Sequence, residues 1–208
     1  SDEKKPASRV AANDKIVLGF IGVGGDRGMG TGLLKIFKNT KDFPDIEVAA
    51  VCDVYEKHAM QARTIAGGKA KEYGDFRRVL DRKDIDAVVI ATPDHWHAIP
   101  TILACQAEKD VYCEKPLAHR VREGRAMVKA SNQYRRVTQM GNLIHAGENY
   151  HRVVEIVRSG VLGQITKTRV WMAADRSGLG SPADSTPPAG CDYDFWLGPA
   201  PKRPFNSN

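Results

Sequence analysis

Two clusters of polar residues follow directly on short apolar runs. Thr92-Pro93-Asp94-His95-Trp96-His97 comes after Asp86–Ala91, and Glu114-Lys115-Pro116 comes after Asp110–Cys113. In an open parallel sheet, ligands bind beyond the carboxyl ends of the strands. Polar side chains placed directly after a buried strand therefore lie at the ligand. These two clusters bring carboxylates, an amine and imidazoles to that edge, which are groups that bind ligands and move protons.

A glycine-rich stretch, IGVGGDRGMG at Ile21–Gly30, follows the first apolar run. Gly22 and Gly24 fit the G-x-G-x-x-G fingerprint, but the third glycine comes one position late, at Gly28. In such a turn, glycines let the chain reverse tightly and approach a pyrophosphate, and the N–H groups of the next helix point at the phosphate. One interpretation is a dinucleotide site with a longer turn, in which Gly25 supplies backbone freedom. A glycine-rich loop without a ligand is the alternative.

An acidic residue ends the second apolar run. Asp53 closes IEVAAVCD, 25 residues beyond Gly28. A carboxylate at that position accepts hydrogen bonds from an adenosine ribose and repels a 2′-phosphate, which favours NAD over NADP. The alternative is a strand-end aspartate that caps the helix beginning near Tyr55.

Short β-branched runs alternate with helical patterns up to Gly141. Such alternation predicts right-handed crossovers and a parallel sheet. The runs are mostly apolar, as expected for strands that helices cover on both faces. We therefore expect an α/β fold with a Rossmann-type, doubly wound parallel sheet. The predicted strands are Lys15–Ile21, Ile46–Asp53, Asp86–Ala91, Asp110–Cys113 and Val137–Gly141, and the predicted helices are Met29–Lys38, Tyr55–Ile65, Phe76–Leu80, His97–Glu108 and Arg122–Tyr134.

The pattern changes after Gly141. Tyr150–Ser159 is typical of a helix stopped by Gly160, and Gln164–Met172 alternates like a strand with one wet face. Residues 173–208 are rich in Pro, Gly, Ser and Asp and contain the aromatic cluster Tyr193, Phe195 and Trp196. We expect a disordered leader over 1–14, one α/β domain over 15–141, and the beginning of an incomplete, truncated α+β domain over 142–208.

Composition sets limits on the class of protein. With 42% hydrophobic and 27% charged residues, the chain has the make-up of an ordinary soluble globular protein. Its apolar runs are far too short to span a bilayer, so we expect no membrane association. The net charge of +6 suits an anionic ligand, but no basic run is interleaved with aromatics, so we expect no nucleic acid partner.

The cysteines and histidines allow one further alternative, a metal site. The four cysteines form no C-x-x-C pair, and Cys52, Cys105 and Cys113 fit buried small side chains. The pair His95-x-His97, with His145 and His151, is a conceivable zinc ligand set. Acid or cysteine partners at suitable spacing are absent, so we expect no metal, and His58 and His119 fit surface or packing positions.

Taken together, the glycine turn, ATPDHWHA, CEKP and the tail DFWLGPAP resemble the Gfo/Idh/MocA family (glucose–fructose oxidoreductase, inositol dehydrogenase) of nicotinamide oxidoreductases. The resemblance runs from about Lys15 to the end of the chain. Thr138–Tyr150, TQMGNLIHAGENY, resembles a branch of exported bacterial proteins that act on sugars. That branch and the polar leader slightly favour a periplasmic location over a cytoplasmic one.

The resemblance implies roles for individual residues of this chain. It assigns 15–141 to NAD(P) binding and 142–208 to a substrate domain. It marks Lys115 and His97 as candidate catalytic residues; the alternatives are a structural ion pair or a ribose hydrogen bond for Lys115 and a histidine of the second domain as the base. It puts substrate contacts at His145 in doubt, because the family often has arginine there. The residues implied to bind the cofactor are Gly22, Gly24, Gly25, Arg27, Gly28, Met29, Asp53, Thr92, Pro93, His97, Glu114, Lys115 and Asn142.

The activity implied by the resemblance is hydride transfer between a sugar or polyol carbinol and the nicotinamide of NAD. Two alternatives stay open: a glycosidase-type reaction that oxidises its substrate transiently with tightly held NAD, and a fragment that binds NAD without catalysis. Family members carry a large second domain and usually pair through it, so the resemblance also implies a homo-oligomer for an intact protein.

Overall fold

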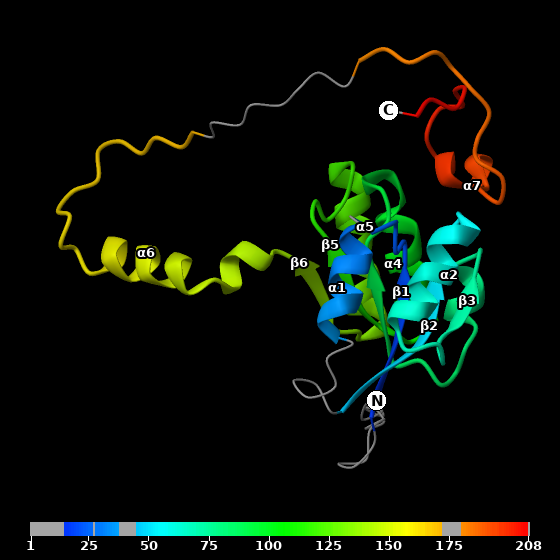
Figure 1. The fold of residues 1–208 in the computed structure, drawn as a ribbon. Coiled ribbons are helices and arrows are strands. Elements are labelled where there is room, and N and C mark those ends of the chain that lie inside the picture. The colour runs from blue at the N-terminus through cyan, green and yellow to red at the C-terminus, as the bar shows by residue number, and fades with distance from the viewer. Residues whose placement is uncertain (1–14, 27, 38–44, 172–179, 208) are drawn as a thin grey trace. The chain divides into compact units, whose positions relative to one another are not determined.

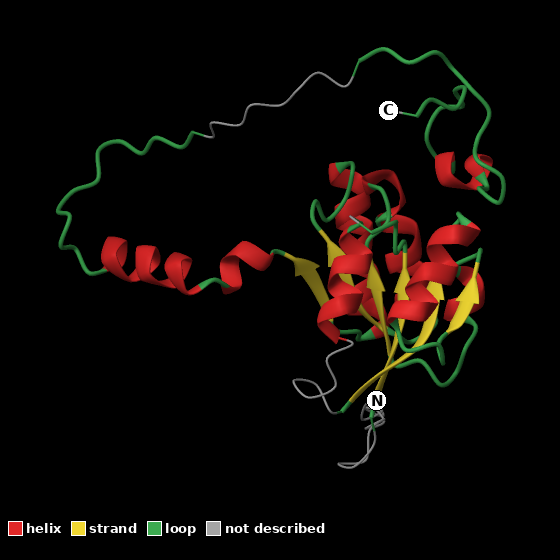
Figure 2. Ribbon diagram, in the orientation of Figure 1, coloured by secondary structure: helices red, strands yellow, loops and turns green. Residues whose placement is uncertain are grey.

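The computed structural model describes residues 15–26, 28–37, 45–171 and 180–207. Its centre is a six-stranded parallel sheet with the strand order β3-β2-β1-β4-β5-β6 (Figures 1 and 2). Every pair of neighbouring strands is parallel. The strands are β1 (Ile16–Ile21), β2 (Ile46–Cys52), β3 (Lys71–Tyr73), β4 (Ala87–Ile90), β5 (Asp110–Glu114) and β6 (Thr138–Gly141).

Helices cover both faces of the sheet, and each face has its own core. One core joins Phe20 and Val51 of the sheet to Leu33 and Leu34 of α1 and to Ala62 of α2. The other core packs the opposite strand faces against the remaining helices of this part of the chain. The helices concerned are α1 (Met29–Phe37) and α2 (Glu56–Ile65) on the first face, with α3 (Arg77–Leu80), α4 (Ala98–Gln106) and α5 (Val121–Tyr134) on the second.

The strand order reverses direction between β1 and β4. The chain moves from β1 outward to β2 and β3, then returns to the other side of β1 with β4 and continues to β5 and β6. The helices that follow β1 and β4 therefore pack on opposite faces of the sheet. The point between β1 and β4 is the topological switch point at which open α/β sheets bind their ligands.

The chain divides into two compact units. The first unit, here called the sheet unit, runs to Gly141 and also includes the later segment Pro187–Arg203. The short helix α7 (Tyr193–Leu197) belongs to that segment, and Cys191 forms an antiparallel bridge with Tyr55. The sequence assigns this segment to the second domain, whereas in the structure it groups with the sheet.

The second unit comprises Asn142–Thr186 and Pro204–Asn208. It contains the 3-10 helix η2 (Leu143–Ala146), the helix α6 (Glu148–Arg158) and an isolated bridge between Ser185 and Phe205. The described side chains of α6 are exposed, including Val153 and Ile156.

The predicted doubly wound parallel sheet is confirmed. All five predicted strands form, with ends that differ from the prediction by a residue or less. The sequence did not predict β3 or α7. The strand expected over Gln164–Met172 is wrong, since residues 164–171 form no strand and are exposed, and Met172 lies outside the described residues. The expected leader over 1–14 also lies outside them. Over the described residues, no helix is long and apolar enough to cross a membrane.

Candidate dinucleotide-binding site

The glycine turn leaves β1 through two residues in the left-handed region. Gly22 has φ of +78° and Gly24 has φ of +64°, a conformation that glycine adopts without steric cost. A Cβ on Gly22 would lie 2.6 Å from the backbone nitrogen of Thr92, so the ends of β1 and β4 touch here. Gly25 does not take a positive φ. The expectation that Gly25 supplies the backbone freedom is therefore wrong, and Gly22 and Gly24 supply it.

Close packing of α1 onto the turn depends on two further glycines. A Cβ on Gly28 would lie 2.7 Å from the carbonyl oxygen of Val23, and one on Gly30 would lie 2.4 Å from that of Gly22. Sequence reasoning missed Gly30, although it is part of IGVGGDRGMG, because the fingerprint places the helix-packing glycine earlier. Thr31 was also missed. Its buried Oγ1 donates to the carbonyl oxygens of Val23 and Gly24, at 3.0 and 3.1 Å.

Asp53 connects the glycine turn to the start of α2. Its Oδ2 accepts a hydrogen bond from Gly24 N at 2.7 Å, and its Oδ1 accepts one from Tyr55 N at 2.9 Å. Only 10% of the Asp53 side chain is exposed. The N-cap of α2 is Tyr55, and it makes no side-chain capping bond. Asp53 therefore does not cap α2 as the alternative interpretation required, but fixes the turn in front of it.

His58 lies beside this carboxylate, a contact that the sequence did not predict. Its Nδ1 is 3.6 Å from Asp53 Oδ1, and its Nε2 would be 3.1 Å from a Cβ on Gly25. The imidazole also makes an edge contact with Tyr55, with ring centroids 4.7 Å apart. The available signal was its place in the first turn of the helix that follows the acidic residue.

The loop after β4 is held from within by His97. Its side chain is buried, with Nε2 at 2.8 Å from the carbonyl oxygen of Thr92 and Nδ1 at 2.6 Å from that of Pro116. Both ring nitrogens are thus engaged by backbone, and His97 joins the loops that follow β4 and β5. Pro93 precedes the 3-10 helix η1 (Asp94–Trp96). Thr92 Oγ1 is buried and makes no hydrogen bond to any described residue.

Glu114 and Lys115 lie at the end of β5 in different surroundings. Glu114 is buried and accepts hydrogen bonds from Tyr112 Oη at 3.3 Å and from Lys115 N at 3.0 Å. Burial, followed by the charge of Glu114, raises the pKa of the Tyr112 phenol. A Cβ on Gly141 would lie 2.7 Å from Glu114 Oε1 and from Tyr112 Oη, so a larger residue there would displace these side-chain ends. The Lys115 side chain is exposed, and it forms no ion pair with the described residues.

The segment Pro187–Arg203 packs against both the β2–α2 loop and η1. Asp192 N donates to Val54 O, and Glu56 N donates to Gly190 O, each at 2.9 Å. Trp96 Nε1 donates to the carbonyl oxygens of Phe195 and Trp196, and the Trp96 and Phe195 rings meet edge-on.

Histidines of the rejected zinc set have other partners. His95 Nε2 lies 2.9 Å from the Trp196 carbonyl oxygen, and His151 Nε2 lies 3.0 Å from that of His145. Among the residues that the structure describes, no three His, Cys, Asp or Glu side chains are grouped to hold a metal ion.

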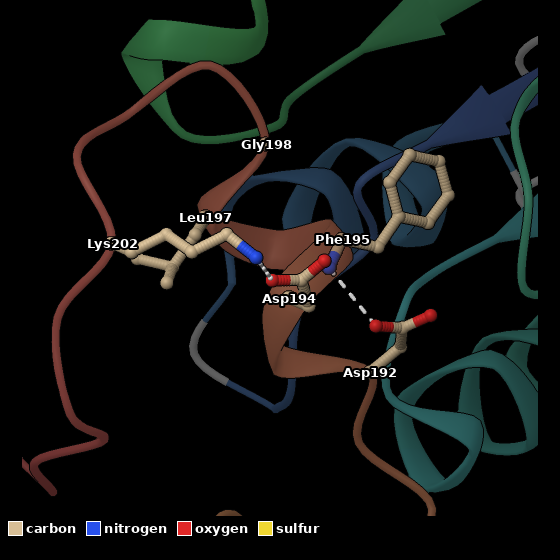
Figure 3. A pocket seen from close by; sticks show the side chains of 6 residues that line it. All are labelled: Asp192, Asp194, Phe195, Leu197, Gly198 and Lys202. Carbon is tan, nitrogen blue, oxygen red and sulfur yellow. Dashed lines mark hydrogen bonds and ion pairs between the residues drawn. The ribbon is translucent and has the colours of Figure 1, made fainter.

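A pocket of about 250 Å³ lies within the segment Pro187–Arg203 (Figure 3). Asp194 and Lys202 form an ion pair at its rim, and Asp192 Oδ1 accepts a hydrogen bond from Phe195 N. Leu197 and Gly198 complete its lining. None of the residues expected to bind a cofactor lines this pocket.

Three other expected cofactor residues have separate positions. Arg27 lies outside the described residues. Met29 is the first residue of α1, directly after the glycine turn, and its side chain is exposed. Asn142 directly follows β6 and belongs to the second unit.

These features fit a dinucleotide. The turn and the N-terminus of α1 present backbone N–H groups where a pyrophosphate binds. The glycine positions leave room that a Cβ would fill, the Asp53 carboxylate lies against the turn, and Thr92 Oγ1 has no hydrogen-bond partner among the described residues. Fold and site together define a Rossmann dinucleotide-binding domain.

Comparison with known proteins gives the family. Residues 16–142 match the oxidoreductase family Gfo/Idh/MocA, described as an NAD-binding Rossmann fold. The chain belongs to this family. An inositol 2-dehydrogenase from Salmonella paratyphi B is 31% identical over 147 residues, which cover 70% of this chain and 42% of that protein. A glycosyl hydrolase family 109 protein from Shewanella pealeana is 29% identical over 177 residues, covering 78% of this chain and 38% of that protein.

A solved structure agrees with the fold. The myo-inositol dehydrogenase from Lactobacillus casei in complex with NAD(H) and myo-inositol has a TM-score of 0.64 at 26% identity, covering 72% of this chain and 43% of that one. The chain thus spans less than half the length of the relatives that it matches.

Proposed function

We propose that the sheet unit binds NAD in preference to NADP. The observation that carries this proposal is that Asp53 directly follows β2 and that its carboxylate lies against Gly24 of the glycine turn. In Rossmann folds an acidic residue at this point binds the adenosine ribose. A carboxylate there accepts hydrogen bonds from the ribose hydroxyls and repels a 2′-phosphate. The other parts of the site have matching roles: the glycine turn and the N-terminus of α1 hold the pyrophosphate, and Thr92 Oγ1 has hydrogen-bonding capacity for the bound dinucleotide.

We further propose that the whole protein oxidises or reduces a sugar or polyol at a carbinol carbon. This proposal is supported by the family and by relatives named inositol 2-dehydrogenase. The nicotinamide ring, when bound, accepts or donates the hydride. The protein orients the two reactants and handles the proton of the alcohol.

Lys115 is the proposed proton carrier. It is exposed directly after β5, at the carboxyl edge where the nicotinamide half of a dinucleotide binds, and its ammonium is not committed to an ion pair with the described residues. Oxidised nicotinamide carries a positive charge and disfavours a second one nearby, which helps the lysine to release a proton. His97 has a positioning role instead, because both of its ring nitrogens are engaged by backbone carbonyls.

The test of Lys115 compares Lys115→Ala with Lys129→Ala, an exposed lysine on α5. In a protein that includes the second domain, we expect Lys115→Ala to lower turnover by about 100-fold or more while NAD affinity changes little. Lys129→Ala should leave both unchanged. Unaltered turnover in Lys115→Ala would remove the proton-carrier role.

The relative named as a glycosyl hydrolase family 109 protein supports a second candidate function. This second candidate is a glycosidase-type reaction that oxidises its substrate transiently. NAD would stay tightly held and be regenerated in each cycle, so the net result would be cleavage of a glycosidic bond. Net formation of NADH with a free sugar or polyol supports the dehydrogenase. Turnover of a glycoside with NAD needed only in catalytic amounts supports the alternative, and NAD binding without turnover of either substrate supports a non-catalytic module.

A further inference from the structure

His58 connects the two parts of the site that surround the adenosine ribose. Its Nδ1 lies 3.6 Å from Asp53 Oδ1, and its Nε2 reaches toward Gly25 in the glycine turn. The His58 side chain is 30% exposed, whereas that of Asp53 is 10% exposed. The imidazole is therefore the more accessible member of the pair and lies on its solvent side.

The orientation of Asp53 does not depend on His58. Two backbone amides, Gly24 N and Tyr55 N, already fix one carboxylate oxygen each. What His58 changes is the charge of this corner. When the imidazole is neutral, the pair of Asp53 and His58 has a net charge of −1. With a protonated imidazole, the pair has no net charge.

We propose that His58 is a specificity-determining residue that adjusts how strongly Asp53 excludes a 2′-phosphorylated dinucleotide, so that the preference for NAD over NADP weakens as the pH falls. This inference rests on the proposed NAD binding. Histidine is the side chain whose charge ordinarily changes between about pH 5 and pH 8. A 2′-phosphate placed at the ribose-binding acid meets repulsion from Asp53 above this range and a compensated pair below it.

Other titratable groups belong to the elements packed around His58. Glu56 lies on the same helix, and its Oε2 would be 3.1 Å from a Cβ on Gly190. Asp26, in the glycine turn, accepts a hydrogen bond from Gln61 of α2. Cys191 forms a β-bridge with Tyr55, and burial, followed by the charges of Asp53 and Asp192, raises the pKa of its thiol. The titratable groups of the elements around His58 are thus Asp26, Asp53, Tyr55, Glu56, Cys191 and Asp192.

The experiment measures the dissociation constants of NAD⁺ and NADP⁺ by calorimetry on the 208-residue chain, at about pH 5.5 and about pH 8.5. The 2′-phosphate itself takes up a proton near about pH 6, so wild type is compared with His58→Gln at each pH. The dissociation constant of NADP⁺ divided by that of NAD⁺ measures the preference for NAD. As the pH falls, this ratio should decrease by about three- to tenfold more in wild type than in His58→Gln. His119→Gln, on an exposed histidine just before α5, should follow wild type.

Each outcome decides the matter. Equal pH profiles in wild type and His58→Gln overturn the role of His58 while leaving NAD binding intact. Failure of wild type to bind either dinucleotide overturns the proposed NAD binding, and the role of His58 with it. If His58→Gln does not fold, His58→Phe keeps a ring against Tyr55 and Gly25 without the charge, and the same comparison applies.

Discussion

The carboxylate of Asp53 accepts a hydrogen bond from the backbone amide of Gly24, with Oδ2 and N 2.7 Å apart. These residues come from different strand ends, and the bond crosses from β2 to the turn after β1. One side chain thereby fixes the shape of the glycine turn, and under the proposed function it also binds the ribose. Asp53 should therefore affect both stability and NAD affinity, and a suitable control separates the two effects.

Asp53→Asn should lower both the stability of the protein and its affinity for NAD. The asparagine amide presents one NH2 group in place of an oxygen, so either Gly24 N or Tyr55 N faces a donor, at a cost of about 1–3 kcal/mol in the free energy of unfolding. The loss of a charged acceptor should lower NAD affinity about tenfold or more. Calorimetry and urea unfolding measure the two quantities.

Asp86 offers the matched control. Its Oδ2 accepts a hydrogen bond from Val17 N at 2.8 Å, before β4 and therefore at the opposite edge of the sheet. Asp86→Ala leaves Val17 N without this acceptor, so it should lower the free energy of unfolding by a comparable amount, about 1–3 kcal/mol, and leave NAD affinity unchanged. Equal loss of affinity in both variants would mean that Asp53 acts only through stability.

Gly30→Ala and Gly32→Ala should have opposite effects, although both glycines lie in α1. A Cβ on Gly30 would lie 2.4 Å from Gly22 O, and relieving that overlap should cost about 1–3 kcal/mol. A Cβ on Gly32 meets nothing within 4 Å, and alanine there should stabilise the helix by up to about 1 kcal/mol. Thermal unfolding measures both, and NAD affinity should fall only in Gly30→Ala. Similar melting temperatures would show that α1 does not need the close approach.

Much of the sheet unit could be predicted from the sequence, because its strands are apolar runs buried on both faces. That signal fails for β3, whose three residues are Lys71, Glu72 and Tyr73 at an edge of the sheet. It also fails for residues 164–171, where alternation is present but no neighbouring strand pairs with the segment. A single strand has no stability of its own, so alternation predicts a strand only where partners exist.

The candidate site was predictable where a motif is local and not where contacts are remote in sequence. The turn, Asp53 and the loops after β4 and β5 each follow a strand directly. The contact of Trp96 with Phe195 joins residues 99 positions apart, and His58 meets Gly25 only after the fold brings α2 to the turn. No periodicity encodes such pairs.

Phe195→Ala should loosen the loop after β4. The Phe195 ring lies 5.3 Å from that of Trp96 and 6.1 Å from that of Phe76, between centroids. Removing it should lower the free energy of unfolding by about 2 kcal/mol and speed hydrogen exchange at the amides of Trp96 and His97. Phe195→Leu keeps most of the apolar volume and should show a smaller change. Unchanged exchange at these amides in Phe195→Ala would show that the segment does not hold the loop.

Cys113 should make stability fall at alkaline pH. Burial raises the pKa of its thiol from 9.0 to about 11. The raised pKa leaves stability unaffected below about pH 9, and stability is lost as the pH rises toward 11, because the unfolded thiol ionises first. At about pH 10 the loss should be about 1.4 kcal/mol. The test is urea unfolding of wild type and Cys113→Ala at about pH 8 and about pH 10, since the variant has no thiol to ionise at this position. The free energy of unfolding of Cys113→Ala, lower than that of wild type at about pH 8, should come closer to it at about pH 10 by this loss of about 1.4 kcal/mol. An equal difference at both pH values would show that the buried thiol does not resist ionisation.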